Sequence, residues 1–173
     1  MIVFLNREVV RRLSDDDATL TGFFTMPAYK YVHDIMLRDC EPSGIVFLPR
    51  YFDMVHTVIE NWLDEALDWP ISQIQGSDGL SLPFVNISAE FPAPSRLGDR
   101  LTWRLSVREL RRSSIWLELG ATTGAEARVS VTGTLVLTEA LALRTRRWPE
   151  SIAERVKDYL VSSDEASGKK VAE

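Results

Sequence analysis

The chain is organised around a short turn with the sequence Asp39-Cys40-Glu41-Pro42-Ser43-Gly44-Ile45-Val46-Phe47. Pro42 fixes its own φ angle and Gly44 tolerates a positive φ, which together predict a tight turn. Pro49 follows closely and suits the first turn of a helix. We therefore expect the carboxylate of Glu41 to lie near a helix N-terminus, where backbone N–H groups have no intrahelical acceptor and favour anions.

The residues after the turn predict one long helix that ends near Leu67. At about 100° per residue, its apolar side chains fill an arc wider than half of the circumference. These side chains are Phe52, Met54, Val55, Val58, Ile59, Trp62, Leu63, Ala66 and Leu67. Such an arc is typical of a helix that other elements surround. His56 falls inside the arc, where a histidine is usually a core residue satisfied by one hydrogen bond.

Composition limits the classes of protein that fit. The 173 residues are 45% hydrophobic, which suits one domain with a sizeable core. A net charge of −5 argues against general nucleic-acid binding. One cysteine and two histidines provide neither an internal disulfide nor metal-ligand spacing, and no apolar run approaches the roughly 20 residues that span a bilayer. We expect a soluble cytoplasmic protein with no nucleic-acid or membrane partner.

The rest of the chain alternates with a period of two, which predicts strands. These cover residues 29–38, 82–91, 100–109, 114–122 and 127–137, with a loop at 68–81. Short connections between consecutive strands require antiparallel hairpins. Pro149 begins a short helix that reaches about Leu160. The predicted fold class is α+β, with about five antiparallel strands wrapped around one long central helix.

The same patterns define the domain organisation. Residues 1–28 read as an N-terminal arm of unassigned role, residues 29–161 as the single domain, and residues 162–173 as a polar tail that we expect to be disordered. A single five-stranded sheet leaves strand edges that proteins usually cover. We therefore expect a homodimer that joins its sheets edge to edge, or a homotetramer.

The turn also carries a family resemblance. Glu41-Pro42-Ser43-Gly44-Ile45-Val46-Phe47, with Tyr51 four residues later, resembles the signature of the 4-hydroxybenzoyl-coenzyme A thioesterase family of the hot-dog fold superfamily. The likeness continues to about Leu160. It implies the hot-dog fold and hydrolysis of an acyl-coenzyme A thioester by dimers or tetramers. It implies no metal and no cofactor other than the coenzyme A of the substrate. The family's carboxylate is normally aspartate, whereas this chain has Glu41.

The resemblance implies a role for several residues. Glu41 would be the nucleophile or general base, and backbone N–H groups near Phe47 and Leu48 would stabilise the oxyanion. The remaining site residues would contact the acyl-coenzyme A substrate: Tyr51, His56, Arg111 and Arg112. In the family, the part of the helix that carries His56 lines the acyl pocket, and basic residues at the hairpin of Arg111 and Arg112 meet the phosphates of coenzyme A.

Plainer interpretations stay open beside these. Glu41 also suits a helix N-terminus electrostatically. Asp39 is an alternative carboxylate, but the simpler interpretation is that it caps the turn. Cys40 is an alternative nucleophile, but by default it is a small buried side chain. Arg111 and Arg112 fit a polar turn.

Upstream of that turn, Arg100, Arg104 and Arg108 fit a solvated strand face. Two other activities remain alternatives. One is a non-catalytic acyl-coenzyme A binder, and the other is a hot-dog dehydratase, for which His33 and His56 are the histidines available.

Overall fold

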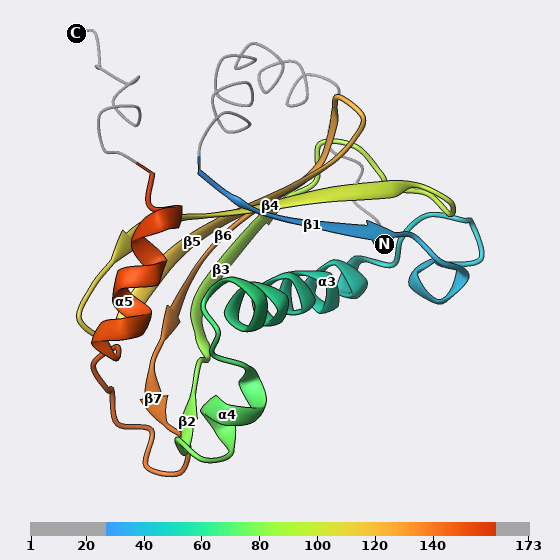
Figure 1. The fold of residues 1–173 in the computed structure, drawn as a ribbon. Coiled ribbons are helices and arrows are strands. Elements are labelled where there is room, and N and C mark those ends of the chain that lie inside the picture. The colour runs from blue at the N-terminus through green and yellow to red at the C-terminus, as the bar shows by residue number, and fades with distance from the viewer. Residues whose placement is uncertain (1–26, 162–173) are drawn as a thin grey trace, which may run out of the picture.

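A computed structural model describes residues 27–161 of the chain. Five antiparallel strands form the main sheet in the order β1-β4-β5-β6-β3, and they curve around one long helix, α3 (Figure 1). The bounds are β1 (Tyr29–Asp34), α3 (Leu48–Asn61), β3 (Phe84–Glu90), β4 (Arg100–Leu110), β5 (Ser114–Thr123) and β6 (Glu126–Val136). The fold class predicted from the sequence is confirmed. Except for Pro27 and Ala28, the predicted N-terminal arm lies outside the described residues, as does the tail after 161.

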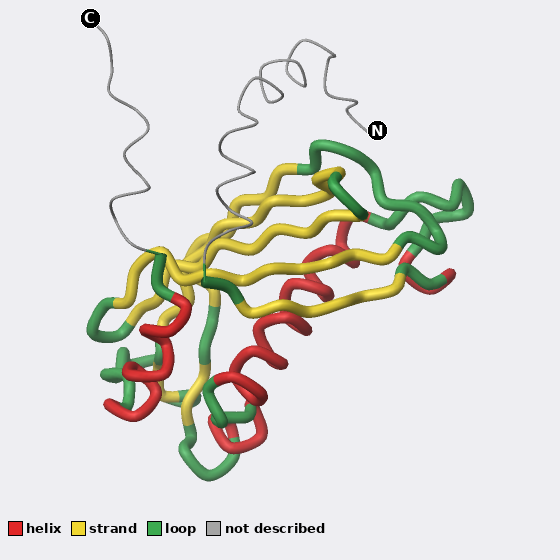
Figure 2. The backbone as a smooth tube through the Cα atoms, turned by 45° about the horizontal axis from the view of Figure 1, so that its top comes forward, coloured by secondary structure: helices red, strands yellow, loops and turns green. Residues whose placement is uncertain are grey.

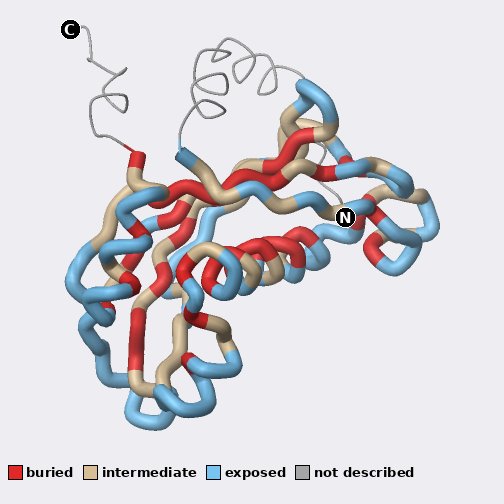
Figure 3. The backbone as a smooth tube through the Cα atoms, viewed as in Figure 1, coloured by how far each residue is buried: buried red, intermediate tan, exposed pale blue. Residues whose placement is uncertain are grey.

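Helix α3 buries the apolar side of its circumference against the sheet (Figure 2). Five of its side chains are buried: Tyr51, Met54, Val55, Val58 and Ile59. The helix continues into a single π-helical turn, η2 (Trp62–Ala66), where Trp62 and Leu63 are fully buried. In Figure 2 the helix crosses one face of the sheet along its length, and Figure 3 shows the buried segments gathered between the two.

The first strand is shorter than the alternation predicts. β1 ends at Asp34, and a 3-10 turn, η1 (Leu37–Asp39), follows before the chain reaches the acidic turn. Alternation over residues 29–38 places His33, Ile35 and Leu37 on one face, but Leu37 is 74% exposed, whereas Ile35 is buried. The backbone N–H of Met36 donates to the carboxylate of Asp39. A side-chain acceptor that captures a backbone donor favours a turn over a continued strand.

The predicted loop at 68–81 is partly structured, which corrects the sequence expectation. It contains a short helix, α4 (Ile71–Gln75), and a strand, β2 (Leu80–Ser81), that pairs with β7 (Thr138–Glu139). Ile74 is fully buried, and Trp69 Nε1 donates to Asp78 at 2.8 Å. A five-residue helix and a two-residue strand are too short to leave a readable period.

The C-terminal helix is confirmed. Helix α5 (Glu150–Val156) has Pro149 as its N-cap residue and ends in a 3-10 turn, η3 (Lys157–Tyr159). Leu160 then forms a parallel bridge with Val107, so the end of the described chain covers part of the β4 edge that β1 leaves unpaired. The ring of Tyr159 packs edge-on against Trp62, with centroids 5.9 Å apart.

One face of β4 is less solvated than the sequence suggests. Arg104 is buried, and Arg108 forms an ion pair with Glu118 on β5. Of these three arginines, Arg100 alone is exposed as expected, and it forms an ion pair with Asp34 at 2.8 Å. Burial lowers the pKa of Arg104, because the charged form loses solvation.

Candidate active site

The acidic turn is a small hairpin, as predicted. Cys40 and Val46 form an antiparallel bridge, the N–H of Glu41 donates to Ile45 O at 2.8 Å, and the N–H of Gly44 donates to Glu41 O at 2.9 Å. Gly44 has a φ of +79°, a region that costs a residue with a Cβ atom free energy. The hairpin therefore needs glycine at this position, and the sequence provides it.

Glu41 lies at the tip of this hairpin, close to the start of α3. The opposing residues Asp39 and Phe47 are joined by a backbone hydrogen bond of 2.9 Å, and α3 begins one residue later. Glu41 is two residues after Asp39, a separation of about 7 Å in an extended chain. Its side chain is half-buried, and within residues 27–161 no hydrogen bond or ion pair engages its carboxylate. The carboxylate is thus available for chemistry.

The segment before β4 holds the hairpin in place. Val46 N–H donates to Ser95 O and Leu97 N–H donates to Gly44 O, both at 3.0 Å. The hydroxyl of Tyr51 accepts the Ser95 N–H at 3.2 Å, and its ring lies 5.0 Å from that of Phe91. Tyr51 is buried, so its observed role is to fix this segment. The substrate contact assigned to it from the family stays a prediction.

The two candidate oxyanion donors differ. The N–H of Phe47 already donates to Asp39 O, so it is not free to receive a developing oxyanion, which corrects the expectation for this residue. Leu48 is the first residue of α3, and an N–H at this position has no acceptor within its own helix. Pro49 carries no N–H. Leu48 therefore remains the candidate donor next to Glu41. The side chains of Phe47 and Leu48 are about half exposed.

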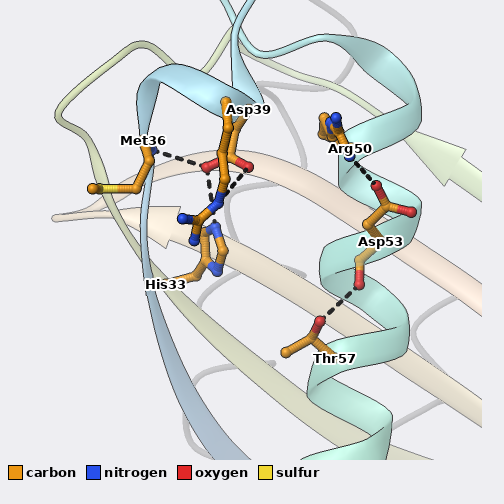
Figure 4. Close-up of polar contacts among 7 residues, drawn as sticks. His33, Met36, Asp39, Arg50, Asp53 and Thr57 are labelled. Atoms are coloured by element: carbon orange, nitrogen blue, oxygen red, sulfur yellow. Dashed lines mark hydrogen bonds and ion pairs between the residues drawn. The ribbon is translucent and has the colours of Figure 1, made fainter.

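Asp39 caps the turn, which was the simpler of its two interpretations. Its side chain is buried, and its Oδ2 accepts the Met36 N–H at 2.9 Å. His33 Nε2 lies 3.5 Å from the same oxygen, and Arg38 Nε lies 4.0 Å from Oδ1. Figure 4 shows the His33 imidazole reaching from β1 towards this carboxylate, beside the first turns of α3. Sequence reasoning missed His33 here, because the end of β1 and the turn η1, which bring it back to Asp39, leave no periodic signal.

Cys40 is not set up as a nucleophile. It is a free, half-buried cysteine. Burial raises the pKa of its thiol, and the negative charges of Asp39 and Asp99 raise that pKa further. A reactive cysteine needs the opposite environment, one that lowers the pKa. The default interpretation of a small packed side chain agrees with this environment.

His56 is exposed on α3, so its interpretation as a core residue is wrong. Its Nδ1 donates to Phe52 O at 2.8 Å, and its ring meets Phe84 edge-on with centroids 5.8 Å apart. Phe84 comes from the edge strand β3. The histidine thus lies between the exposed side of α3 and the edge of the sheet, a place where a ligand or a partner subunit can reach it.

Arg111 and Arg112 lie far from Glu41 in this chain. They follow β4, whereas the acidic turn contacts residues 95–97 before β4 begins. The strand has 11 residues, which span about 35 Å at the usual rise. Both arginines are exposed. Arg111 Nε donates to Glu109 at 2.8 Å, which lowers the pKa of the Glu109 carboxyl. The structure therefore does not bring the hairpin arginines and the carboxylate together in one chain.

Residues 27–161 contain no group of three or more His, Cys, Asp or Glu side chains placed to hold a metal ion. No helix in this part of the chain is long and apolar enough to cross a membrane.

Part of the sequence is similar to a curated hydrolase. No protein-family model matches the chain. The curated relative is a 1,4-dihydroxy-2-naphthoyl-CoA hydrolase from Synechocystis sp., 29% identical over 82 residues. The match covers 47% of this chain and 59% of the relative, so the chain spans little more than half the length of that protein.

Solved structures give a broader likeness. A 1,4-dihydroxy-2-naphthoyl-CoA thioesterase from Synechocystis superposes with a TM-score of 0.70 at 20% identity, over 76% of this chain and 96% of that one. A gentisyl-coenzyme A thioesterase gives 0.67 at 24% identity, over 74% and 99%. A Staphylococcus aureus protein in complex with CoA gives 0.70 at 13% identity, over 84% and 94%. With its five antiparallel strands curved around α3, this chain has the α+β hot-dog fold.

Proposed function

We propose that this protein hydrolyses the thioester of an acyl-coenzyme A. The observation that supports this most directly is the unengaged carboxylate of Glu41 at the tip of a hairpin that leads straight into α3. A carboxylate beside a helix N-terminus combines the two groups that acyl transfer to water requires. One attacks the carbonyl or activates water, and the other stabilises the oxyanion. The relative from Synechocystis, named as a CoA hydrolase, gives independent support.

In this proposal Glu41 is the nucleophile or the general base. As a nucleophile, its carboxylate would attack the thioester carbonyl, coenzyme A would leave as the thiolate, and water would hydrolyse the resulting anhydride. As a general base, it would take a proton from a water that attacks directly. In both routes the N–H of Leu48 would bind the oxygen on which negative charge develops. The products would be a free acid and coenzyme A.

The position of the arginines favours a site shared between two subunits. The arm of coenzyme A between sulfur and pyrophosphate has about 13 bonds, and an extended chain advances roughly 1.2 Å per bond, which gives about 16 Å. That is about half of the length of β4, which separates Glu41 from Arg111 and Arg112. We propose that the thioester meets Glu41 of one subunit while the phosphates meet these arginines of another. This requires the homodimer expected from the open sheet edge.

For the acyl group we propose an aromatic acid. The curated relative is named for a naphthoyl thioester, and one structural neighbour is named for a gentisyl thioester. In this chain, the exposed ring of Phe47 stands next to the turn, and His56 and Phe84 form a second aromatic contact. Turnover should therefore rank aryl-coenzyme A substrates above acetyl- and palmitoyl-coenzyme A.

Two observations favour other activities. The longer side chain of glutamate, where the family normally has aspartate, favours a non-catalytic acyl-coenzyme A binder, because about 1 Å of misplacement can cost about 10²-fold in rate. The His33–Asp39 contact of 3.5 Å is the acid–imidazole pair that a dehydratase would need. Asp39 is buried and already accepts the Met36 N–H, so hydrolysis remains the stronger proposal. Formation of an enoyl product from a 3-hydroxyacyl-coenzyme A would reverse that order.

Replacement of Glu41 by glutamine tests the proposal. The variant keeps the shape of the side chain and the hairpin but removes the charge, so attack and base catalysis both fail. We expect kcat to fall by about 10²–10⁴-fold, while the affinity for coenzyme A stays close to that of the wild type. Release of free thiol measures the rate. Glu150→Gln is a matched control, because Glu150 is an exposed glutamate in the first turn of α5.

Glu41→Asp tests the fit of the longer side chain. If the site is built for glutamate, aspartate falls short and activity drops, whereas a site of the family's usual shape would gain activity. Equal thioester hydrolysis by the wild type and Glu41→Gln would remove Glu41 from the mechanism. Binding of coenzyme A without hydrolysis of any thioester would establish the binder instead.

A further inference from the structure

A second arginine-bearing segment lies beside the β4–β5 hairpin. Residues 144–148 come more than 30 positions after Arg112, yet the N–H of Trp148 donates to Arg112 O at 3.1 Å. The N–H of Arg146 donates to Leu137 O at 2.8 Å, and the N–H of Leu137 donates to Ser113 O at 2.8 Å. These backbone bonds fix the segment next to the hairpin. The result is an arginine strip, made of Arg111, Arg112, Arg144, Arg146 and Arg147.

The segment is held firmly at both ends. Trp148 is buried, and its ring packs against Trp69 with centroids 6.0 Å apart. At the other end Thr145 bridges Thr138, and Arg144 O accepts the Glu139 N–H at 2.8 Å. Side chains alternate along an extended chain, so a buried Trp148 directs the preceding Arg147 towards solvent, where it is exposed. Arg147 is therefore presented by a fixed backbone.

The charges of the strip are only partly compensated. Arg111 is paired with Glu109 at 2.8 Å and Arg146 with Glu139 at 3.1 Å. Within residues 27–161, no carboxylate pairs with Arg112, Arg144 or Arg147. This excess of positive charge occurs in a chain whose net charge is −5. Arginines without carboxylate partners are suited to phosphates, which they bind through paired N–H donors.

We propose that Arg147 belongs to the coenzyme A site and binds, with Arg112, the phosphates of its nucleotide end. This inference rests on the proposed function, because that function supplies the ligand. It adds a residue from the C-terminal segment to a hairpin that the family resemblance alone had singled out. Coenzyme A carries a pyrophosphate and a 3′-phosphate, so it offers more anionic groups than the two hairpin arginines would neutralise.

The charge balance favours a small nucleotide over a nucleic acid. A nucleic-acid surface needs many cations along a groove or stripe, whereas three uncompensated arginines match the phosphates of one coenzyme A. The rest of the chain, being acidic overall, would repel a longer polyanion. The ligand class is therefore an adenosine carrying phosphates at its 3′ and 5′ positions.

The test uses adenosine 3′,5′-bisphosphate, which holds the phosphates but has no thioester. Isothermal titration calorimetry would compare the wild type, Arg147→Ala and Lys30→Ala. Lys30 is an exposed cation of β1, so the control removes the same charge elsewhere. We expect Arg147→Ala to weaken binding by about five- to tenfold, with a smaller effect at high salt. Its KM for acyl-coenzyme A should rise, and its KM for the acyl-pantetheine thioester should not.

The outcomes separate this inference from the proposed hydrolysis. Wild-type turnover with equal bisphosphate affinity in Arg147→Ala would overturn the role of Arg147 and leave the hydrolase proposal standing. Loss of bisphosphate affinity in Arg147→Ala would support the role even if the wild type hydrolysed no thioester. Arg147-dependent binding of single-stranded RNA, without binding of the bisphosphate, would assign the strip to a different ligand and overturn the inference.

Discussion

At the scale of single residues, two carboxylates on one hairpin have opposite environments. Asp39 is buried, accepts a backbone N–H and lies near His33. Glu41, two residues on, is half-buried, and within residues 27–161 its carboxylate has no partner. Because a catalytic carboxylate must be free to reach the substrate, local structure assigns these residues different tasks. Asp39 builds the turn, and Glu41 is the candidate for the chemistry.

His56 provides a prediction at this scale. Because His56 is exposed, His56→Ala should change the free energy of unfolding by no more than about 1 kcal/mol, mainly through the lost ring contact with Phe84. The same change should alter the ranking of acyl-coenzyme A substrates, measured as kcat/KM across aryl and alkyl thioesters. Glu60→Ala, an exposed change one helical turn later on α3, is the control. An unchanged ranking together with a large loss of melting temperature would return His56 to a purely structural role.

At the scale of elements, the contact between β6 and β3 depends on a missing side chain. A Cβ atom built on Gly133 of β6 would lie 2.6 Å from Phe84 Cε1 and 3.1 Å from Asn86 O. Phe84 in turn meets His56 on α3. Gly133 thus lets the edge strand approach β6 closely and lets one aromatic ring join three elements. Strand β3 has a β-bulge between Phe84 and Asn86.

Gly133→Ala should therefore destabilise the protein. We expect a loss of about 1–3 kcal/mol in the free energy of unfolding, because the methyl group forces Phe84 to move. Urea denaturation would measure it. Phe84→Leu removes the obstructing ring atoms, so the double variant should lose less than the sum of the two single changes. Additive losses would show that Phe84 is not the obstacle.

At the scale of the whole molecule, the sheet ends in an unpaired strand. Among residues 27–161, β3 pairs only with β6, and Val85 and Ile87 on it are 61% and 38% exposed. Ile87 lies opposite Gly133, on the face where the β6 neighbours Val131 and Leu135 are buried. An open strand edge with uncovered apolar residues is suited to pairing with another chain. Under the proposed function, the separation of Glu41 from Arg111 and Arg112 also calls for a second chain.

We predict a homodimer through β3, or a tetramer made of two such dimers. Light scattering at micromolar concentration should give twice or four times the mass of the chain, and Ile87→Lys should reduce it. Val32→Lys is the matched control, because Val32 is similarly exposed on β1 at the opposite edge of the sheet. A wild-type monomer at this concentration would contradict the dimer, and with it the shared site. The cytoplasmic location expected from the composition stays a prediction.

The sequence by itself determined the local elements, because their signals are local. Pro42 and Gly44 predict the hairpin, the apolar arc predicts α3, and alternation predicts the strands, all of which the structure contains. The signal failed where an element is short or where a side chain captures the backbone. Examples are α4, the β2–β7 pair and the early end of β1, where Asp39 accepts the Met36 N–H.

Only the tertiary structure decided what meets across long stretches of chain. The strand order β1-β4-β5-β6-β3 and the bond between Trp148 and Arg112 depend on how apolar faces are shared, which a local period does not record. The same holds for His56, which the helical arc placed in the core. The arc gives the direction in which His56 points around the axis of α3. Whether that direction faces the sheet or its open edge depends on where β3 ends. The separation of Glu41 from the hairpin arginines likewise follows from the length and direction of β4.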